Sequence, residues 1–394
     1  MKKLISLIMV LIICIGLLPF GIMASDEVET VTYTDSRGNA VPIPGGDKSF
    51  AAQVVEFIPG SPMTTDPLDT DPAEILGVPD RRGHTNGKAI TLGAGGIIVL
   101  EFERLITDGE GDDIYVFEVG DAIEATNVEV SYDLKTWYYV GVCRGATASV
   151  DISGADSVAP SEYKYKYVRL TDGYSEPDGR YPGADIDAVA GLNTRQAATG
   201  SIWANEELEK ADMMNLIPDV LVDADLTKPI TRAEFAAVAV KTYEALSGTK
   251  AIPAVVNPFI DCSDIEVLKA YNIGAVNGMS ATTFVPDALL NREQAATMLT
   301  RVFKRVSIPG WTLAADSQFS LDYEKPSPFA DDALISAWAK DSVYFMAANS
   351  IINGMGNNIF APKNTTSEQE ALGYANATRQ QALLIAVRMV ENLA

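Results

Sequence analysis

The 394-residue chain has little of the chemistry on which most hydrolases and zinc enzymes depend. It contains one histidine, His84, and three cysteines. A single histidine leaves almost no material for a His-based catalytic triad or a zinc site. Cys14 lies in an apolar leader, and Cys143 and Cys262 fall in regions that we assign to different domains, so a disulfide framework is excluded.

Basic residues are scarce as well. Lys and Arg number 30 against 53 Asp and Glu, which gives a formal net charge of −23 at pH 7. Proteins bind phosphate backbones through clustered Lys and Arg, so we expect no nucleic-acid partner. Hydrophobic residues make up 47% of the chain, enough for folded cores, and the length predicts two or three domains.

An apolar run stands at the start of the chain. Two lysines precede apolar residues from Leu4 to Met23, and the small residues Ala24 and Ser25 follow. This pattern predicts a secretory signal peptide over residues 1–24. The run is also long enough to span a bilayer if it is not cut. We expect cleavage near Ala24, a secreted protein, and no stable membrane span afterwards.

Residues 25–195 are predicted to form an antiparallel β-sandwich of the jelly-roll type. Short runs of Val, Ile, Tyr and Phe alternate with polar residues and are separated by Gly, Asp and Ser. The Pro-, Asp- and Gly-rich segment 59–87 is expected to be a long surface loop. The clearest expected strands are residues 97–103, 114–119, 128–132, 137–143 and 163–170.

Two acidic clusters in this region suggest a metal site. Asp112 and Asp113 precede one strand, Glu118 lies near its end, and Asp185 and Asp187 follow the last expected strand. Ca²⁺ takes six to eight oxygen ligands of this kind, whereas zinc favours His and Cys. The spacing is not that of an EF-hand loop, and turn formation by Asp and Gly is the alternative explanation.

The second half of the chain repeats itself. Thr-Arg-Ala-Glu at 231–234 recurs as Asn-Arg-Glu-Gln at 291–294 and as Thr-Arg-Gln-Gln at 378–381, each before an apolar-periodic run. Three helical repeats are therefore predicted, at residues 201–248, 257–306 and 327–394. One such unit cannot bury its apolar faces alone, so we expect an α-rich domain with pseudo-threefold symmetry. Residues 307–326 are expected to be a linker, and 363–377 an inserted loop.

Each copy of this motif combines two functions. Thr or Asn followed three residues later by Glu or Gln is a capping box, which would start a helix in any protein. The Arg is not needed for the cap, and the helix dipole disfavours a cation there by roughly 0.3–1 kcal/mol. Binding of an anion and salt bridges between repeats are the two explanations that remain open.

These repeats resemble the S-layer homology repeats of bacterial surface proteins, over residues 200–394. The likeness rests on Phe-x-Asp at 259–261 and 329–331, on a Trp near a helix start, on Asn-Gly turns followed by Phe-x-Pro, and on the Thr-Arg-Ala-Glu motif. The resemblance implies a three-pronged spindle that holds secondary cell-wall polysaccharide, often through a pyruvylated sugar, in grooves between the prongs. The residues that it implies for this binding are Arg232, Arg292, Arg379, Trp203, Trp338, Asp261 and Asp331.

The repeats depart from the family pattern at several places. The first lacks Phe-x-Asp and the Gly of the turn, the second lacks the Trp, and the third carries the insertion. We therefore expect that not every groove needs to bind. A core position for the Trp side chains and helix capping by the Asp side chains are the alternatives to sugar contact.

The front domain resembles galactose-binding-like or discoidin-like jelly rolls through residues 127–137 and 167–172, over about residues 90–192. Such folds support sugar-binding, protein-binding and structural roles, so the ligand of this domain stays open. We predict a non-catalytic protein of the cell wall or cell surface. The alternative is an anchored glycan-active enzyme that uses two carboxylates from the acidic clusters.

Overall fold

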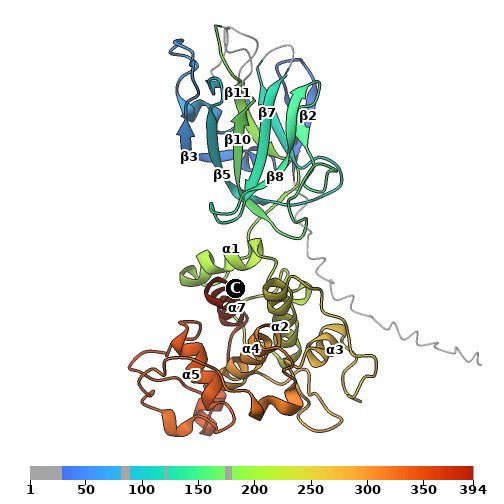
Figure 1. The fold of residues 1–394 in the computed structure, drawn as a ribbon, viewed down its shortest axis with the longest axis vertical. Coiled ribbons are helices and arrows are strands. Elements are labelled where there is room, and N and C mark those ends of the chain that lie inside the picture. The colour runs from blue at the N-terminus through green and yellow to red at the C-terminus, as the bar shows by residue number, and fades with distance from the viewer. Residues whose placement is uncertain (1–28, 81–88, 120–122, 174–179, 394) are drawn as a thin grey trace, which may run out of the picture.

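A computed structural model describes residues 29–393, except for residues 81–88, 120–122 and 174–179. The predicted signal peptide and His84 lie outside the described residues. Figure 1 shows a lobe of strands above a lobe of helices. Within the described part of the chain, no helix combines the length and apolar character needed to cross a bilayer.

The upper lobe contains two antiparallel sheets and a separate hairpin. Its strands are β1 (Thr30–Thr34), β2 (Ala40–Pro44), β3 (Ala51–Ile58), β4 (Ile90–Thr91), β5 (Ile97–Ile106), β6 (Ile114–Glu118), β7 (Ile123–Ser131), β8 (Tyr138–Gly145), β9 (Ser149–Val150), β10 (Tyr165–Asp172), β11 (Asp185–Gly191) and β12 (Thr194–Arg195). The larger sheet has the order β12-β5-β10-β7-β8, with β3 also paired to β5. The smaller sheet has the order β4-β11-β6-β9, and β1 pairs with β2.

The core of this lobe lies between the two sheets. Alternate residues of β5, β7 and β10 meet residues of β6 and β11 there, as a period of two requires; among them are Ile98, Leu100, Val128, Val130, Val168, Leu170, Val116, Ile186 and Val189. The five expected strands are confirmed as β5, β6, β7, β8 and β10. One expectation is wrong: Asp185 and Asp187 do not follow the last strand but lie in β11, inside the smaller sheet.

The lower lobe, here called the helical domain, contains α1 (Asn205–Met213), α2 (Arg232–Ser247), α3 (Ile265–Asn272), α4 (Arg292–Ser307), α5 (Lys340–Ala348), α6 (Ser367–Leu372) and α7 (Arg379–Leu393). The long helices α2, α4 and α7 begin at the three copies of the Arg motif. Capping boxes start α2 and α4 as predicted. Thr378 and Gln381 exchange the same two hydrogen bonds at the start of α7.

The helices pack as a closed ring. Each short helix lies against the long helix that precedes it, α3 on α2 and α5 on α4, while α1 lies against α7 at the end of the chain. The long helices meet in the middle, and one hydrophobic core runs through the whole domain. The first and last helices are therefore neighbours (Figure 1).

The segment expected to be a linker, residues 307–326, is instead packed onto α4. Trp311 is fully buried, and its Nε1 donates to Asp316 at 2.9 Å. The Nζ of the buried Lys304, from α4, donates to the same carboxylate at 2.7 Å. The inserted loop at 363–377 likewise contains a helix, α6.

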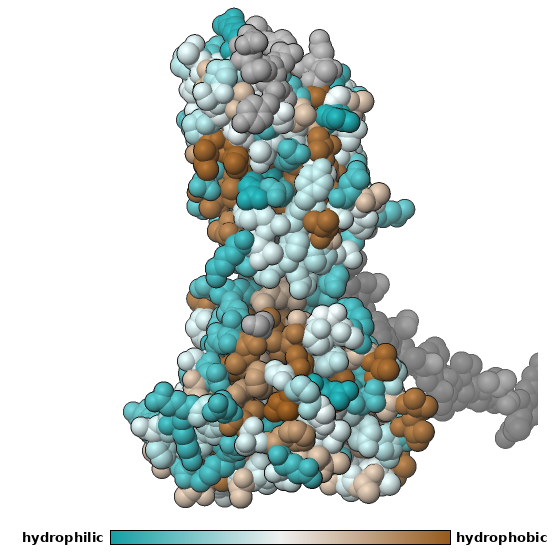
Figure 2. Space-filling model, viewed as in Figure 1, coloured by the Kyte–Doolittle hydropathy of each residue, from teal (hydrophilic) through white to brown (hydrophobic). Residues whose placement is uncertain are grey.

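The two lobes meet at a waist that is visible in Figure 2. Lys166 of β10 donates to Glu209 of α1 at 2.7 Å, and the backbone N–H of Lys164 donates to the carbonyl of Met213 at 3.1 Å. Arg195 also forms an ion pair with the buried Asp212 of α1. These contacts hold the sheets on α1.

Glu118, at the end of β6, is an unusual buried acid. Its side chain is 5% exposed, and its Oε2 has no hydrogen-bond partner among the described residues. Burial, with the charges of Glu124 and Asp185 nearby, raises the pKa of Glu118 to about 9. Protonation therefore favours the folded state, and this stability is lost as the pH rises from about 4.5 towards 9.

We expect Glu118→Gln to raise the melting temperature at pH 8 and to leave it almost unchanged at pH 4. At pH 8 the wild-type protein must keep a proton on a buried acid or bury a charge, and Gln removes this cost. In a domain of this size roughly 2–4 °C correspond to 1 kcal/mol, so calorimetry at the two pH values can resolve the effect. An equal shift at both pH values would contradict the titration.

Candidate functional site

The start of each long helix is bound by the carbonyls of another part of the ring. The first N–H of α2, α4 and α7 donates at 2.9, 3.2 and 2.9 Å, in the pairs Arg232–Ala288, Arg292–Ala375 and Arg379–Lys228. The second N–H does the same, in the pairs Ala233–Pro286, Glu293–Pro362 and Gln380–Leu226. The capping box uses the third. These N–H groups are therefore not open to an anion, although helix starts often bind one.

The Arg232 side chain follows its own helix start into the second predicted repeat. Its Nε donates to the carbonyl of Phe284 at 3.0 Å and its Nη2 to that of Asn277 at 3.1 Å. The guanidinium lies over the Phe284 ring, 4.7 Å from the centroid. Arg232 thus binds both the Asn-Gly turn and the Phe-x-Pro segment, which explains why these motifs occur together.

Arg292 makes the same contacts one repeat further along the chain. Its Nε donates to Phe360 at 2.8 Å, its Nη2 donates to Asn353 at 2.7 Å, and its guanidinium lies 5.1 Å from the Phe360 centroid. Burial lowers the pKa of Arg292, partly offset by Asp331. The Nε and Nη2 donors of the Arg292 guanidinium are therefore satisfied by carbonyl groups and not by a carboxylate.

Arg379 has different partners from Arg232 and Arg292, because the first predicted repeat lacks the Phe-x-Pro segment that those two bind. Its Nε and Nη2 donate to Glu234 at 3.2 and 2.6 Å, and its Nη1 donates to the carbonyl of Asp225 at 3.1 Å. Glu234 lies at the capping-box position where the other two copies carry Gln. The salt bridge between repeats that the sequence left open is therefore present between Arg379 and Glu234. Arg232 and Arg292 form none with the described residues.

Asp261 and Asp331 stabilise a turn and do not cap helices. Asp261 accepts the N–H groups of Phe284 and Val285, both at 2.8 Å, and Asp331 accepts those of Phe360 and Ala361 at the same distances. Val285 and Ala361 have φ of 59° and 57°, a region that L residues rarely adopt. A carboxylate that binds both N–H groups offsets the strain. Asp264 caps α3 instead.

Trp203 and Trp338 are surface residues. They are 62% and 57% exposed; Trp203 lies in the short helical turn 202–204 before α1, and Trp338 lies between the short turn 332–334 and α5. The alternative that places them in the core is therefore wrong. Each ring is available for stacking against a sugar or another flat apolar face.

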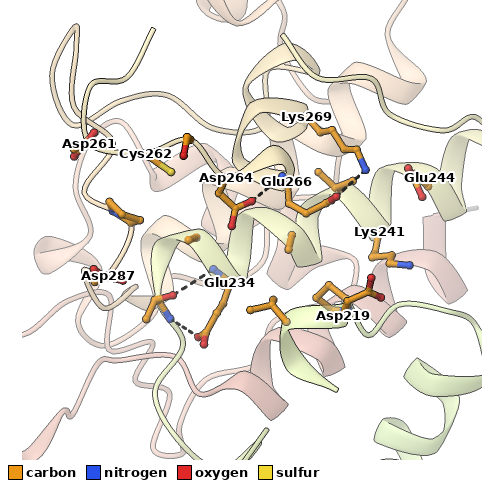
Figure 3. Close-up of a pocket in the computed structure, with 18 of the residues that line it drawn as sticks. Asp219, Glu234, Lys241, Glu244, Asp261, Cys262, Asp264, Glu266, Lys269 and Asp287 are labelled. Atoms are coloured by element: carbon orange, nitrogen blue, oxygen red, sulfur yellow. Dashed lines mark hydrogen bonds and ion pairs between the residues drawn. The ribbon is translucent and has the colours of Figure 1, made fainter. Parts of the chain in front are cut away.

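A groove of about 630 Å³ runs between α2 and α3. Figure 3 shows Glu234 and Lys241 on the α2 side and Asp264 and Glu266 on the α3 side, with Cys262 near one end. Its lining includes three lysines, Lys241, Lys250 and Lys269, and seven acids, Asp219, Glu234, Glu244, Asp261, Asp264, Glu266 and Asp287. Of the predicted polysaccharide-binding residues, only Asp261 lines this groove.

The sandwich brings Asp113 together with Asp108, from the same acidic stretch of the sequence, and with Asp151, which sequence analysis did not select. One carboxylate oxygen from each of Asp108, Asp113 and Asp151 lies within 4.8 Å of the other two. Asp113 is fully buried and accepts bonds from the N–H groups of Gly109 and Ile152, and burial raises its pKa. The Oδ1 of Asp108 is buried and has no partner among the described residues.

The other predicted metal ligands lie apart from this cluster. Asp112 accepts a bond from Ser149, Asp185 accepts one from Thr91, and Asp187 accepts the N–H of Asp80. Glu118 is buried separately. Of the five predicted ligands, only Asp113 belongs to a described cluster with metal-ligand spacing. Asp151 could not be chosen from the sequence, because only the β6–β9 pairing brings it near Asp113.

We expect Arg292→Ala to lower the melting temperature, because it leaves the carbonyl group of the buried residue Phe360 without its donor. A loss of about 1–3 kcal/mol is typical of such a change. Arg305→Ala is the matched control, since Arg305 is exposed on the same helix. Thermal unfolding of both variants checks this, and an Arg292→Ala variant as stable as the control would leave the Arg free for a ligand role.

Comparison with known proteins identifies one part of the chain. Residues 328–372 match the family model of the S-layer homology domain. The chain is 24% identical over 213 residues to an amylopullulanase of Thermoanaerobacterium thermosulfurigenes, a match that covers 48% of this chain and 11% of the relative. It is 27% identical over 174 residues to an exoglucanase of Acetivibrio thermocellus, which covers 43% of this chain and 15% of the relative.

A solved structure, the C-terminal domain of a chitobiase from Bacteroides fragilis, aligns with 38% of this chain and 98% of its own. The identity is 13% and the TM-score 0.24, below the level at which a shared fold is assigned. The matched part of the chain covers only 11% of the length of the amylopullulanase and 15% of that of the exoglucanase. Residues 328–372 are an S-layer homology domain, and this domain indicates anchoring at the cell surface or cell wall.

Proposed function

We propose that the chain is a non-catalytic cell-surface protein, held by non-covalent binding to secondary cell-wall polysaccharide. In this proposal residues 201–248, 257–306 and 327–394 are three S-layer homology repeats with pseudo-threefold symmetry. The match at residues 328–372 carries the proposal. The two backbone bonds that recur at the start of α2, α4 and α7 support the extension to all three repeats, because each repeat then binds the next in one way.

The ligand surface in this proposal combines the α2–α3 groove with exposed aromatic rings. The groove is large enough for a few sugar units and is lined by groups that can bond to hydroxyls. Trp203 and Trp338 supply flat apolar faces. The β-sandwich, fixed on α1, is the displayed part, with a ligand of its own that stays open.

An anchored glycan-active enzyme is the second candidate, because the relatives are named as an amylopullulanase and an exoglucanase. These matches cover only a small part of each enzyme, so they do not show that this chain has the enzymes' activity. Three of the five acids considered for catalysis, Asp113, Glu118 and Asp187, are buried and cannot reach a glycan. Glu110 and Asp112 line a hollow of about 680 Å³ beside Tyr115, and this candidate would place its activity there.

The anchor is tested by sedimentation with purified cell-wall sacculi. We expect the protein to sediment with intact sacculi and to stay in solution once their polysaccharide has been stripped chemically. Binding that depends on the polysaccharide separates this function from general adhesion to peptidoglycan. Equal retention on stripped sacculi would contradict the proposal.

We also propose that Asp108, Asp113 and Asp151 hold Ca²⁺ in the sandwich. Three converging carboxylates, one of them with an orphaned buried oxygen, fit a cation that takes six to eight oxygen ligands. The ion would neutralise charges that otherwise repel within the cluster, where burial and, to a smaller extent, the charge of Asp108 raise the pKa of Asp113. Its role there would be structural.

We expect Ca²⁺ to raise the melting temperature of the sandwich and a chelator to reverse the rise, because an ion bound only by the folded state stabilises it. Asp151→Asn should abolish this response. Glu110→Gln is the control, an exposed acid in the same loop as Asp108. Calorimetry with and without chelator measures the effect, and a Ca²⁺ response that persists in Asp151→Asn would place the ion elsewhere.

A further inference from the structure

One side-chain amide at the waist is contacted by a lysine from each lobe. Asn215 follows α1, and its Oδ1 accepts from the Nζ of Lys164 at 3.4 Å and from the Nζ of Lys241 at 3.3 Å. Lys164 belongs to the sandwich and immediately precedes β10, whereas Lys241 lies in α2. An ammonium group can only donate hydrogen bonds, so both lysines meet the oxygen end of the amide. Two amines are thereby placed beside one carboxamide carbon.

The backbone holds Lys164 and Asn215 in this arrangement. The N–H of Lys164 donates to the carbonyl of Met213 at 3.1 Å, and the N–H of Asn215 donates to the carbonyl of Asp212 at 3.0 Å. Asn215 has a φ of 54°, a region that Asn adopts more readily than most residues. Reacting groups that a fold holds roughly 3–3.5 Å apart behave as if they were present at a very high concentration. The fold therefore favours a reaction between this amine and this amide.

The surroundings of Lys164 favour its neutral form. Burial lowers the pKa of its ammonium group, and the positive charges of Arg195 and Lys241 act in the same direction. The negative charges of Asp212 and Asp219 act against this shift without reversing it. A lysine becomes a nucleophile when it loses its proton, and desolvation and a neighbouring cation are two usual causes.

We propose that the amine of Lys164 and the carboxamide of Asn215 condense to an isopeptide bond, which joins the sandwich covalently to the helical domain. A bond forms between Nζ of Lys164 and Cγ of Asn215, and the bond between Cγ and Nδ2 breaks. One proton passes from Nζ to Nδ2, and ammonia leaves. The reaction needs no oxidant and no cofactor, and the inference is independent of what the helical domain binds.

Lys241 supplies positive charge where the reaction requires it. Attack at Cγ places negative charge on Oδ1 of Asn215, and Nζ of Lys241 lies 3.3 Å from that oxygen. Removal of one such donor typically slows a reaction at a carbonyl by roughly 10²–10³-fold. The two lysines therefore have different roles: the neutral amine of Lys164 attacks, and the ammonium of Lys241 stabilises the oxyanion.

The bond would give the waist a second covalent connection. Along the chain, residues 196–204 join β12 of the sandwich to α1 of the helical domain. Lys164 precedes this segment and Asn215 follows it, so a bond between their side chains closes a loop around it. A sandwich linked in this way stays attached to the helical domain even when the connecting segment is cut.

Peptide mapping of the purified full chain by mass spectrometry tests the proposal. We expect a branched tryptic peptide that joins the segments of Lys164 and Asn215 and is lighter than their sum by one ammonia. Lys164→Arg, which keeps the charge, and Asn215→Gly, which suits the positive φ, should give linear peptides only. Lys250→Arg is the control, because Lys250 lines the same small hollow as Asn215, and it should keep the branch.

A wild-type chain without the branched peptide would overturn the proposal, and so would loss of ammonia without branching, which indicates a succinimide. A branch that persists in Lys164→Arg would overturn the choice of nucleophile. We expect Lys241→Met to form the branch roughly tenfold or more slowly in a pulse-labelled time course, because methionine brings no charge to the oxyanion. A rate equal to that of wild type would remove Lys241 from the mechanism.

A cut in the connecting segment gives a second readout. With a protease site inserted between residues 196 and 200, the cut wild-type chain should run as one species on a denaturing gel. The cut Lys164→Arg chain should run as two fragments, while the cut Lys250→Arg chain should behave like wild type. Separation of the wild-type fragments would overturn the covalent link.

Discussion

The helical domain depends on the way in which each long helix begins. The first N–H groups of a helix have no partner within it, and leaving a buried donor unpaired costs about 1–3 kcal/mol. In α2, α4 and α7 the partners are carbonyls from the next segment of the ring. The capping box of each segment satisfies only the third N–H, so the first two depend on another segment. This is a direct physical reason for three segments to assemble and for the last to return to the first.

The arginine next to each helix start extends this dependence from backbone to side chain. Arg232 and Arg292 bind the Asn-Gly turn and the Phe-x-Pro segment of the following repeat, while Asp261 and Asp331 hold the strained residue inside that segment. Where the segment is missing, Arg379 takes a carboxylate instead. The motif thus has an architectural use at all three positions.

The sandwich is governed by a different constraint, the burial of acids in a chain of strongly negative charge. Asp113 is held by three hydrogen bonds from the protein, whereas Glu118 has an oxygen without a described partner and a raised pKa. Burial raises the pKa of both acids, to about 9 for Glu118, where the like charges of Glu124 and Asp185 add to the effect. At Asp113 the three hydrogen-bond donors favour the charged form and counteract the effect of burial.

The sequence by itself determined the features that depend on near neighbours. Capping boxes fixed where α2, α4 and α7 begin, alternation located five strands, and the repeated motifs marked the helical domain, because these signals act within a few residues. Tertiary structure decided what the same side chains touch. The contacts of Arg232 with residues 277 and 284 and the meeting of Asp108 with Asp151 join residues far apart in the chain. The folding of the ring and of the two sheets sets which of them come within bonding distance.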